Sequence, residues 1–317
     1  MIVLANDGMA TGGIEALEKA GFRVITTRVA QEQLADFIQR EGVRGLLVRS
    51  ATQVTRDLID ACPDLRLIGR GGVGMDNIEV DYARKKGIHV VNTPKASSDS
   101  VAELVFAHLY GGVRFLHESN RNMPLEGDQH FKALKKAYSK GIELRGKTLG
   151  IIGFGRIGKA VARIGLGVGM RVLYNDQETT SATVTVDFFN GQAVDFKLES
   201  TPLETVLAES DFVSLHVPAQ DKTLIGSREI DLMKTGAALI NTSRGGVVDE
   251  VALVESLDAK KLSFAALDVF ASEPKPEIQL LMQPKISLSP HIGASTLEAQ
   301  ERIGRELAQQ VIDLLSD

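Results

Sequence analysis

A glycine-rich turn between an apolar run and a helical pattern constrains this chain more than any other stretch. The apolar residues 149–152 lead directly into Gly153-Phe-Gly-Arg-Ile-Gly158, and a helical pattern follows over Lys159–Gly169. The spacing Gly-x-Gly-x-x-Gly allows a tight turn, lets a diphosphate approach the backbone and lets the helix pack on the strand. Free N–H groups at the start of the helix attract an anion. The sequence therefore predicts a βαβ unit that binds a dinucleotide.

An acidic residue stands where such a unit meets the ribose of its ligand. A second apolar strand, Arg171–Asn175, ends at Asp176, which lies 23 positions after Gly153. A carboxylate there accepts hydrogen bonds from a ribose 2′-hydroxyl and repels a 2′-phosphate, so we expect NAD rather than NADP as the cofactor. A glycine turn that binds nothing is the alternative interpretation, and the strand, the helix and the acid together argue against it.

Short apolar runs alternate with helical patterns on both sides of this unit. We expect strands at Ile2–Ala5, Arg23–Thr26, Gly45–Arg49, Leu67–Arg70 and His89–Asn92, and again at Phe212–Val217, Ala237–Asn241, Phe264–Asp268 and Ile286–Ser289. Alternation of this kind predicts parallel sheets with helices on both faces. A length of 317 residues is enough for two domains with separate cores.

The expected fold class is α/β, with two Rossmann- or flavodoxin-like doubly wound parallel-sheet domains and a cleft between them. We place a discontinuous substrate-binding domain at residues 1–98 plus 292–317, and an NAD-binding Rossmann domain at residues 99–291. A long helix that starts near Ser98 connects them. The amphipathic last helix, Thr296–Leu315, can return to the first domain.

Two local patterns and one charged stretch lie outside this alternation. In the helix after the first domain, Ser100 and Glu103 have the Ser-x-x-Glu spacing of a capping box, which makes Glu103 a cap rather than a catalyst. Alternating runs within residues 183–198 flank Asn190-Gly191, which predicts a β-hairpin with a two-residue turn. The polar, basic stretch 117–147 is expected to be a solvated surface.

Composition limits the partners and the compartment. The formal net charge of −5 and the pI near 5.8 argue against nucleic acid or an anionic membrane as the main partner. The single cysteine, Cys62, fits a reducing cytoplasm, and we expect it to pack rather than react. No apolar stretch approaches the ~20 residues of a membrane span, and the first residues lack the basic lead of a signal peptide. We assign no metal ligand.

Three loops that follow expected strands hold polar side chains that a hydrophobic core excludes. The loops are Thr242–Gly246, Asp268–Pro274 and Pro290–Ser295. Together they deliver an arginine, carboxylates and a histidine to one edge of the sheet. A histidine can move a proton near neutral pH, a carboxylate orients it, and an arginine binds a substrate carboxylate through two parallel hydrogen bonds. From the residues alone, His216, His89 and His108 remain alternative histidines for such a role.

These motifs together resemble the D-isomer-specific 2-hydroxyacid dehydrogenase family over essentially the whole chain. The motifs are Gly153-Phe-Gly-Arg-Ile-Gly158, Asn241-Thr-Ser-Arg-Gly-Gly-Val-Val-Asp249, Ala266-Leu-Asp-Val-Phe270 and Pro290-His-Ile-Gly-Ala-Ser-Thr296. The resemblance implies an NAD-dependent oxidoreductase in which Arg244, Glu273 and His291 are catalytic. It also implies that NAD contacts a wider set of residues: Gly153, Gly155, Arg156, Ile157, Gly158, Asp176, His216, Val217, Pro218, Thr242, Ser243, Asp268, Gly293 and Ala294.

Within the family, the first part of the chain is similar to the D-3-phosphoglycerate dehydrogenase branch. The segments Val48-Arg-Ser-Ala-Thr52 and Gly69-Arg-Gly-Gly-Val-Gly-Met-Asp-Asn77 are close to the substrate loops of that branch. This similarity implies hydride transfer between NAD and C2 of a small anionic acid, with 3-phospho-D-glycerate converted to 3-phosphohydroxypyruvate in serine biosynthesis. The residues expected to bind substrate are Arg49, Ser50, Arg70, Val73, Gly74 and Arg244.

Alternatives remain open for the substrate and for the function. Lys95-Ala-Ser97 replaces the Asn-Gly-Asn that is more usual in that branch, so a hydroxypyruvate or glyoxylate reductase, or another D-2-hydroxyacid dehydrogenase, is the runner-up. In the alternative interpretation, Arg49 and Arg70 are solvated side chains beside turn glycines. A co-regulator that binds NAD without metabolic turnover is a distant alternative. Because the chain ends at Asp317, we expect the short form, without a C-terminal regulatory domain.

The resemblance also implies a homodimer, or a higher homo-oligomer, formed through the dinucleotide domain. The apolar helix after Ser98 suits such an interface. Lys135 or Lys136 would then reach the substrate cleft of the partner.

Overall fold

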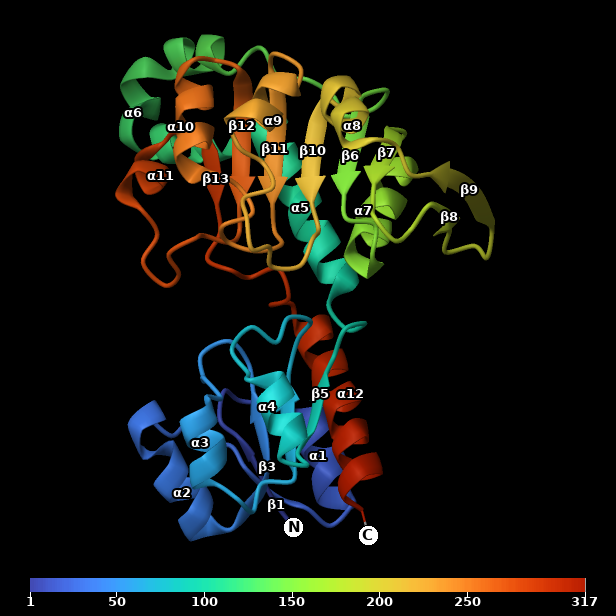
Figure 1. Cartoon of the computed structure of the whole chain (residues 1–317). Helices are drawn as coiled ribbons and strands as arrows, with labels where there is room; N and C mark the ends of the chain where they lie inside the picture. Colours follow the sequence, from blue (N-terminus) through green and yellow to red (C-terminus); the bar gives the residue numbers. More distant parts are fainter. Residues whose placement is uncertain (317) are drawn as a thin grey trace. The chain divides into compact units, whose positions relative to one another are not determined.

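The computed structural model describes residues 1–316 and divides the chain into two compact units (Figure 1). Unit 1 comprises Met1–Ser100 together with the residues from Ala294 onward, and unit 2 comprises Val101–Gly293. Each division lies two residues beyond the boundary expected from the sequence pattern.

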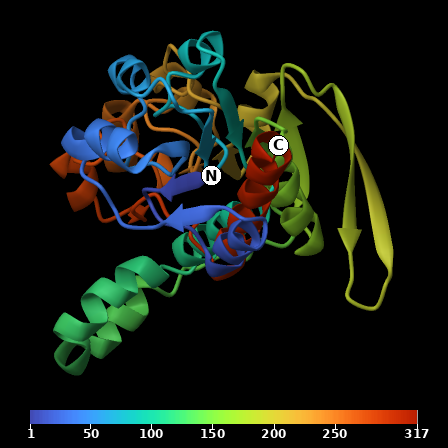
Figure 2. The same cartoon turned by 90° about the horizontal axis from the view of Figure 1, so that it is seen from below.

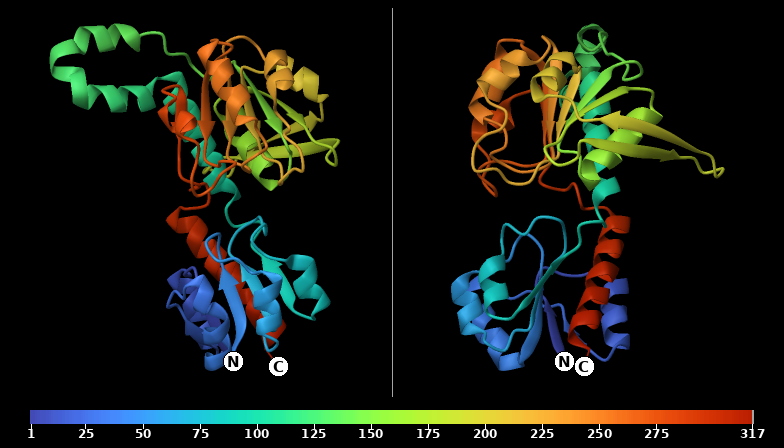
Figure 3. Two further views of the ribbon diagram at one scale, coloured as in Figure 1. Left: turned by 60° about the vertical axis from the view of Figure 1, so that its left-hand side comes forward. Right: turned by 45° about the vertical axis from the view of Figure 1, so that its right-hand side comes forward.

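Unit 1 is built on a parallel five-stranded sheet with the strand order β2-β1-β3-β4-β5. The strands are β1 (Ile2–Ala5), β2 (Arg23–Ile25), β3 (Val43–Val48), β4 (Leu67–Arg70) and β5 (His89–Asn92). The helices are α1 (Thr11–Lys19), the 3-10 helix η1 (Gln31–Gln33), α2 (Leu34–Glu41), α3 (Arg56–Ala61), α4 (Val80–Lys85) and α12 (Leu297–Leu315). Helices α1 and α12 lie side by side on one face of the sheet, and α2, α3 and α4 cover the other (Figures 1 and 3).

The strands of unit 1 are continuous apolar runs because both faces of the sheet are covered. Val3 and Leu47 belong to the core on the side of α1 and α12. Leu4 and Leu46, their neighbours in sequence, belong to the core on the side of α2, α3 and α4. Successive side chains of a strand point to opposite faces, so one run of apolar residues fills both cores.

Unit 2 is built on a parallel six-stranded sheet with the order β13-β12-β11-β10-β6-β7. The strands are β6 (Thr148–Ile152), β7 (Arg171–Asn175), β10 (Phe212–Leu215), β11 (Ala237–Asn241), β12 (Leu262–Leu267) and β13 (Ile286–Leu288). Helices α5 (Ser98–Val113) and α7 (Arg156–Gly167) contribute to the core on one face. Helices α8 (Leu203–Glu209), α9 (Ser227–Leu232), α10 (Glu250–Asp258) and α11 (Ile278–Met282) contribute to the other.

The strand order of unit 2 changes direction between β6 and β10. The chain runs from β6 outward to β7 and then returns to β10 on the other side of β6. Open α/β sheets bind ligands at the carboxyl edge of the strands, where the order reverses in this way. The prediction of an α/β fold with two doubly wound parallel sheets is confirmed.

The hairpin expected within residues 183–198 forms, but its turn is longer than two residues. Strand β8 (Ser181–Asp187) pairs antiparallel with β9 (Ala193–Glu199), so the turn spans residues 188–192. Gly191, with a φ of 84°, donates its N–H to the carbonyl oxygen of Phe188 inside the turn. The prediction of a two-residue Asn190-Gly191 turn is therefore wrong. The hairpin projects from unit 2 beyond β7 (Figure 2).

The capping-box expectation for helix α5 is also wrong. The helix begins at Ser98, so Ser100 lies in its first turn and not at the N-cap position that a capping box with Glu103 requires. Several apolar side chains of α5, among them Val105 and Leu109, are buried in the core of unit 2, whereas Tyr110 is exposed. The buried side chains cannot take part in an interface, and the expectation that this helix contributes to one stays a prediction.

Exposed apolar side chains lie instead on the long helix α6 (Leu116–Ala137), inside the basic stretch that was expected to be solvated. This helix contains Pro124, bends at His130, where the backbone is not helical, and projects from unit 2 (Figures 2 and 3). The exposed apolar residues on α6 are Leu116, Met123, Leu125 and Phe131.

The single cysteine packs in unit 1. Cys62 is buried, and burial raises the pKa of its thiol to about 11, so the thiol stays protonated at neutral pH. The packing prediction is confirmed. Within residues 1–316, no helix combines the length and the apolar content needed to cross a membrane.

Candidate active site

The glycine-rich turn joins β6 to α7 at the carboxyl edge of the unit 2 sheet. Gly153 has a φ of 90°, and a Cβ on it would lie 2.4 Å from the carbonyl oxygen of His216. A Cβ on Gly158 would lie 2.2 Å from the carbonyl oxygen of Gly153, so both positions require glycine. At Gly155, no neighbouring atom of the described chain lies within 4 Å of such a Cβ. The turn is therefore closely packed at its base and open where a diphosphate approaches the backbone.

The first turn of α7 has donors without a local acceptor. Gly155 is the N-cap and has no side chain to accept from the first N–H groups, and the first turn contains no acidic residue. The positive end of the helix dipole is thus available to an anion. Arg156 is exposed there and Ile157 is half-buried.

Asp176 lies beside this turn and stays ionised. Its carboxylate accepts hydrogen bonds from the backbone N–H groups of Phe154 at 2.5 Å, Glu178 at 2.9 Å and Thr179 at 2.7 Å. Burial by itself raises the pKa of Asp176, but these hydrogen bonds outweigh it and lower the pKa below its ordinary value. A charged acceptor next to the open glycine turn suits a ribose hydroxyl.

His216 follows β10, on the other side of the point where the strand order reverses. Its Nε2 lies 2.8 Å from the Oγ of Ser214. Burial lowers the pKa of His216 to about 3, so the ring is neutral at pH 7 and unsuited to proton exchange. Val217, the next residue, lies beside Gly153, and Pro218 is exposed.

The side chain of Asn241, at the end of β11, shapes the turn that holds Arg244. Its Oδ1 accepts from the N–H and the hydroxyl of Ser243, and its Nδ2 donates to the carbonyl oxygen of Arg244 at 2.9 Å. The half-buried Arg244 donates from Nη1 to the carbonyl oxygen of Ser243 at 2.7 Å. A Cβ on Gly245 would lie only 1.9 Å from the carbonyl oxygen of Phe270, so this turn packs directly on the loop after β12.

His291 and Glu273 form a hydrogen-bonded pair. The Nδ1 of His291 lies 2.8 Å from Oε2 of Glu273, and Oε1 of Glu273 accepts from the N–H of Phe270 at 3.0 Å. The His291 side chain is 42% exposed and its backbone has a φ of 54°, in the left-handed region. A carboxylate on Nδ1 fixes the ring and leaves Nε2 for proton exchange with a ligand.

Asp268 connects the loop of His291 to the end of β12. Its buried carboxylate accepts from the N–H groups of Ile292 and Gly293, both at 2.9 Å, and from the Ser289 hydroxyl at 2.6 Å. The backbone that follows His291 is therefore held by one fixed carboxylate. A Cβ on Gly293 would lie 3.1 Å from this carboxylate, which leaves little room for a larger residue.

The three loops of unit 2 thus bring a guanidinium, a carboxylate and an imidazole to the edge where a dinucleotide turn also lies. The family model for the D-isomer specific 2-hydroxyacid dehydrogenase, NAD binding domain, matches residues 106–293. The chain belongs to this family. It is an enzyme of the D-2-hydroxyacid dehydrogenase family and its cofactor is NAD.

The relatives of this dehydrogenase act on different acids. It is 40% identical to hydroxypyruvate reductase from Thermotoga maritima, over 93% of this chain and 92% of the relative. It is 39% identical to D-3-phosphoglycerate dehydrogenase from Methanocaldococcus jannaschii, over 99% of this chain but only 57% of that longer relative. Its structure matches D-lactate dehydrogenase from Aquifex aeolicus, complexed with NAD and lactic acid, with a TM-score of 0.75 and 30% identity over 98% of this chain and 94% of the other.

Besides the glycine turn, two buried polar atoms of unit 2 fit a bound NAD. The Oγ1 of Thr242 and the Nδ1 of His216 are both buried and have no hydrogen-bond partner among the described residues. A buried polar atom without a partner costs free energy, and a cofactor that supplies the hydrogen bond removes that cost. Ala294, also expected to contact NAD, lies in unit 1, and its role stays a prediction.

The arginines expected to bind substrate stand together in unit 1. Arg70 ends β4, and its partner across the ladder is Val48, directly before Arg49. Both arginines are half-buried and lie at the carboxyl edge of the unit 1 sheet. Ser50 and Val73 are exposed beside them and Gly74 is half-buried.

Two residues that are not among the expected substrate-binding residues, Asp7 and Asn77, shape the Arg49 loop. Asp7 accepts from the N–H of Arg49 at 2.6 Å and from the N–H and hydroxyl of Thr52. Asn77 donates through Nδ2 to the carbonyl oxygens of the same two residues at 2.8 and 2.6 Å. Asp7 is 42 positions from Arg49 and stands in no motif, so only the folded sheet brings them together.

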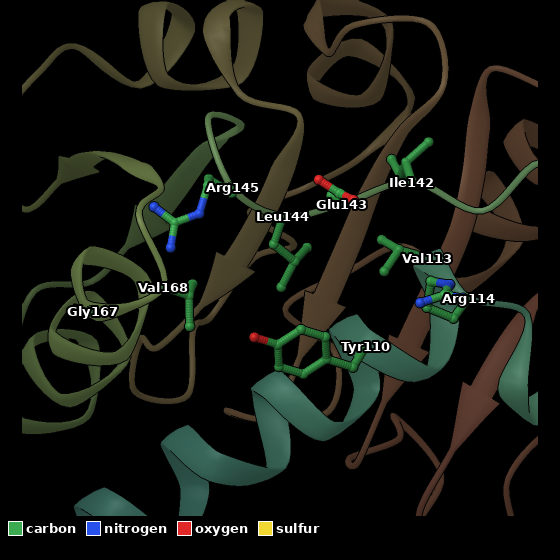
Figure 4. A pocket seen from close by; sticks show the side chains of 9 residues that line it. All are labelled: Tyr110, Val113, Arg114, Ile142, Glu143, Leu144, Arg145, Gly167 and Val168. Atoms are coloured by element: carbon green, nitrogen blue, oxygen red, sulfur yellow. The ribbon is translucent and has the colours of Figure 1, made fainter.

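A pocket of ≈ 460 Å³ in unit 2 is lined by none of the expected site residues (Figure 4). Its walls come from the end of α5, from the segment before β6 and from the end of α7. The lining residues are Tyr110, Val113, Arg114, Ile142, Glu143, Leu144, Arg145, Gly167 and Val168.

Proposed function

We propose that this dehydrogenase oxidises 3-phospho-D-glycerate to 3-phosphohydroxypyruvate, the first step of serine biosynthesis. The pair Arg49 and Arg70 carries this proposal, because two guanidinium groups at one sheet edge match an acid with two anionic groups. The 39% identity to a D-3-phosphoglycerate dehydrogenase supports it.

In the proposed mechanism, Arg244 binds the substrate carboxylate and the C2 oxygen and stabilises negative charge on that oxygen. His291 takes the proton of the C2 hydroxyl on Nε2, while Glu273 on Nδ1 stabilises the imidazolium that forms. Bound NAD supplies the acceptor for the hydride that leaves C2. In the reverse direction, the protonated His291 returns the proton to the C2 oxygen.

Reduction of hydroxypyruvate or glyoxylate is the second candidate, and two observations favour it. The hydroxypyruvate reductase relative is 40% identical and is matched over 92% of its length. Lys95-Ala-Ser97 also departs from the usual phosphoglycerate dehydrogenase pattern. Neither observation removes the paired arginines, so the phosphorylated substrate remains the first proposal.

A panel of acids assayed with NAD(H) separates the two candidates, and Arg49→Ala sharpens the result. We expect the highest kcat/KM for the 3-phosphoglycerate pair. In Arg49→Ala, the KM for the phosphorylated acid should rise about 10- to 100-fold, because a charge-assisted hydrogen bond is lost, while the KM for glyoxylate changes little. Arg84→Ala, at an exposed arginine of α4, is the matched control. An equal rise for both acids would contradict phosphate binding by Arg49, and faster turnover of hydroxypyruvate would favour the reductase.

We further propose that Asp176 selects NAD over NADP through the ribose 2′-hydroxyl. Asp176→Ala removes a charged acceptor, so kcat/KM for NAD should fall about 10- to 100-fold while that for NADP falls less or rises. Asp195→Ala removes an exposed carboxylate on the hairpin and serves as the control. An unchanged ratio of NAD to NADP efficiency would exclude this role.

We also propose that the dehydrogenase forms a homodimer through unit 2. The exposed apolar residues of α6 and the partly apolar pocket of Figure 4 are both on this unit and would be covered in a symmetric pair. Lys135 and Lys136 lie on the same helix. A monomer in sedimentation velocity at micromolar concentration would overturn this proposal.

A further inference from the structure

A buried polar cluster lies between α5 and β13 in unit 2, and the proposed mechanism does not use it. His108 on α5 is 6% exposed, and its ring lies between the hydroxyls of two serines. Its Nδ1 is 2.8 Å from the Oγ of Ser287, and its Nε2 is 2.9 Å from the Oγ of Ser289. The two serines are separated by 179 and 181 positions from the histidine; Ser287 lies within β13 and Ser289 directly follows this strand.

The direction of each hydrogen bond in the cluster follows from the proton count. The hydroxyl of Ser289 donates to Oδ1 of Asp268 at 2.6 Å, because a carboxylate can only accept. The Oγ of Ser289 must then accept from His108, which places the ring proton on Nε2. The remaining lone pair on Nδ1 accepts from the hydroxyl of Ser287, so both ring nitrogens are satisfied in the neutral form.

Burial favours this neutral form. It lowers the pKa of His108, an effect opposed by the negative charge of Asp268 and reinforced by the nearby His117. A neutral ring with one donor and one acceptor is what the two serine hydroxyls require.

The cluster ends at the backbone of the proposed catalytic histidine. Asp268, which accepts a hydrogen bond from the Ser289 hydroxyl, also accepts from the N–H groups of Ile292 and Gly293. These residues directly follow His291, whose ring is bound to Glu273. A continuous series of hydrogen bonds therefore runs from the middle of α5 to the loop that carries the proton-transfer group.

We propose that His108 is a positioning residue, which acts through Ser289 and Asp268 to hold the His291 loop in its working conformation. The inference rests on the proposed catalytic role of His291. Without the ring, Ser289 loses the donor that fixes its hydroxyl, and the Asp268 carboxylate gains freedom to rotate away from Ile292 and Gly293. A displacement of His291 by a fraction of an ångström then costs turnover and leaves substrate binding largely intact.

Four variants test the proposal, with kcat, both KM values and the midpoint of thermal unfolding measured for each. We expect His108→Leu to lower kcat about 10- to 100-fold with little change in either KM. His108→Gln keeps a donor and an acceptor and should recover most of the lost rate. Ser289→Ala should lower kcat to a similar extent, and the double variant His108→Leu/Ser289→Ala should lose no more than the worse single variant, because both act along one route.

A matched control separates positioning from simple destabilisation. Leu109→Ala creates a cavity in the same helix, so it should lower the unfolding midpoint without the kcat loss at a temperature where all variants are folded. A His108→Gln rate as low as that of His108→Leu, additive losses in the double variant, or a kcat loss in Leu109→Ala as large as in His108→Leu would each overturn the proposal. If His108→Leu does not fold, Ser289→Ala decides the proposal, because a normal kcat in that variant would overturn it. His291→Ala is measured alongside, since full activity in that variant would refute the catalytic role itself and not only the part played by His108.

Discussion

Replacement of His291 by alanine is expected to lower kcat by about 10²- to 10⁴-fold, the range that a positioned general acid–base contributes. The physical reason is that, among the described histidines of unit 2, only His291 combines an exposed side chain with a carboxylate bound at 2.8 Å, that of Glu273. The affinity for NAD should change by less than about threefold, because the glycine turn and Asp176, which are proposed to bind the diphosphate and the ribose, lie on other loops. Steady-state kinetics and a fluorescence titration with NADH measure the two quantities.

Among the six histidines of the sequence, the largest loss of kcat is expected on replacement of His291. His130→Ala, at an exposed position on α6, is the control and should retain normal turnover. His216 is an unsuitable proton carrier, because burial holds its pKa near 3. Equal losses of turnover and NAD affinity in His291→Ala would contradict a role in proton transfer.

Replacement of Arg244 by alanine is expected to lower kcat/KM for the acid about 10²- to 10³-fold. The guanidinium is proposed to bind the carboxylate and the C2 oxygen together, so its loss removes both substrate binding and charge stabilisation. Arg244→Lys keeps the charge but lacks the planar fork, and it should recover only part of the loss. The turn itself should survive both changes, because Asn241 holds the backbone of residues 243 and 244.

A comparison of the KM for NAD with the KM for the acid decides whether Arg244 acts on the substrate. The KM for NAD should rise much less than the KM for the acid, and Arg228→Ala, at an exposed arginine on α9, should behave like the unaltered enzyme. A parallel rise in both KM values would indicate a general disturbance of the loops after β11 and β12, and the substrate role would fail.

Local patterns in the sequence are sufficient to predict the fold class and the strands, and to propose the residues of the candidate site. Strands such as β4 and β11 are short apolar runs with polar residues at their ends, and a buried strand of a parallel sheet must have that composition. Gly153 and Gly158 occupy places where any Cβ would overlap a carbonyl oxygen. The close packing of the turn therefore requires glycine at these two positions, and the requirement is visible in the sequence. The family resemblance stood on the same short motifs.

Contacts between distant segments were decided only by the tertiary structure. The 18 positions between Glu273 and His291, the 42 between Asp7 and Arg49, and the 179 between His108 and Ser287 carry no periodic signal, because such pairs form only after the strands have taken their order in the sheet. The exposure of side chains on α5 and α6 was likewise decided only by the tertiary structure. The sequence pattern shows that α5 is apolar but not which of its side chains are covered, and the fold buries most of its apolar side chains while it exposes those of α6. Local sequence determines which elements form and which polar groups end them, and the side chains that meet are determined by sheet order and helix packing.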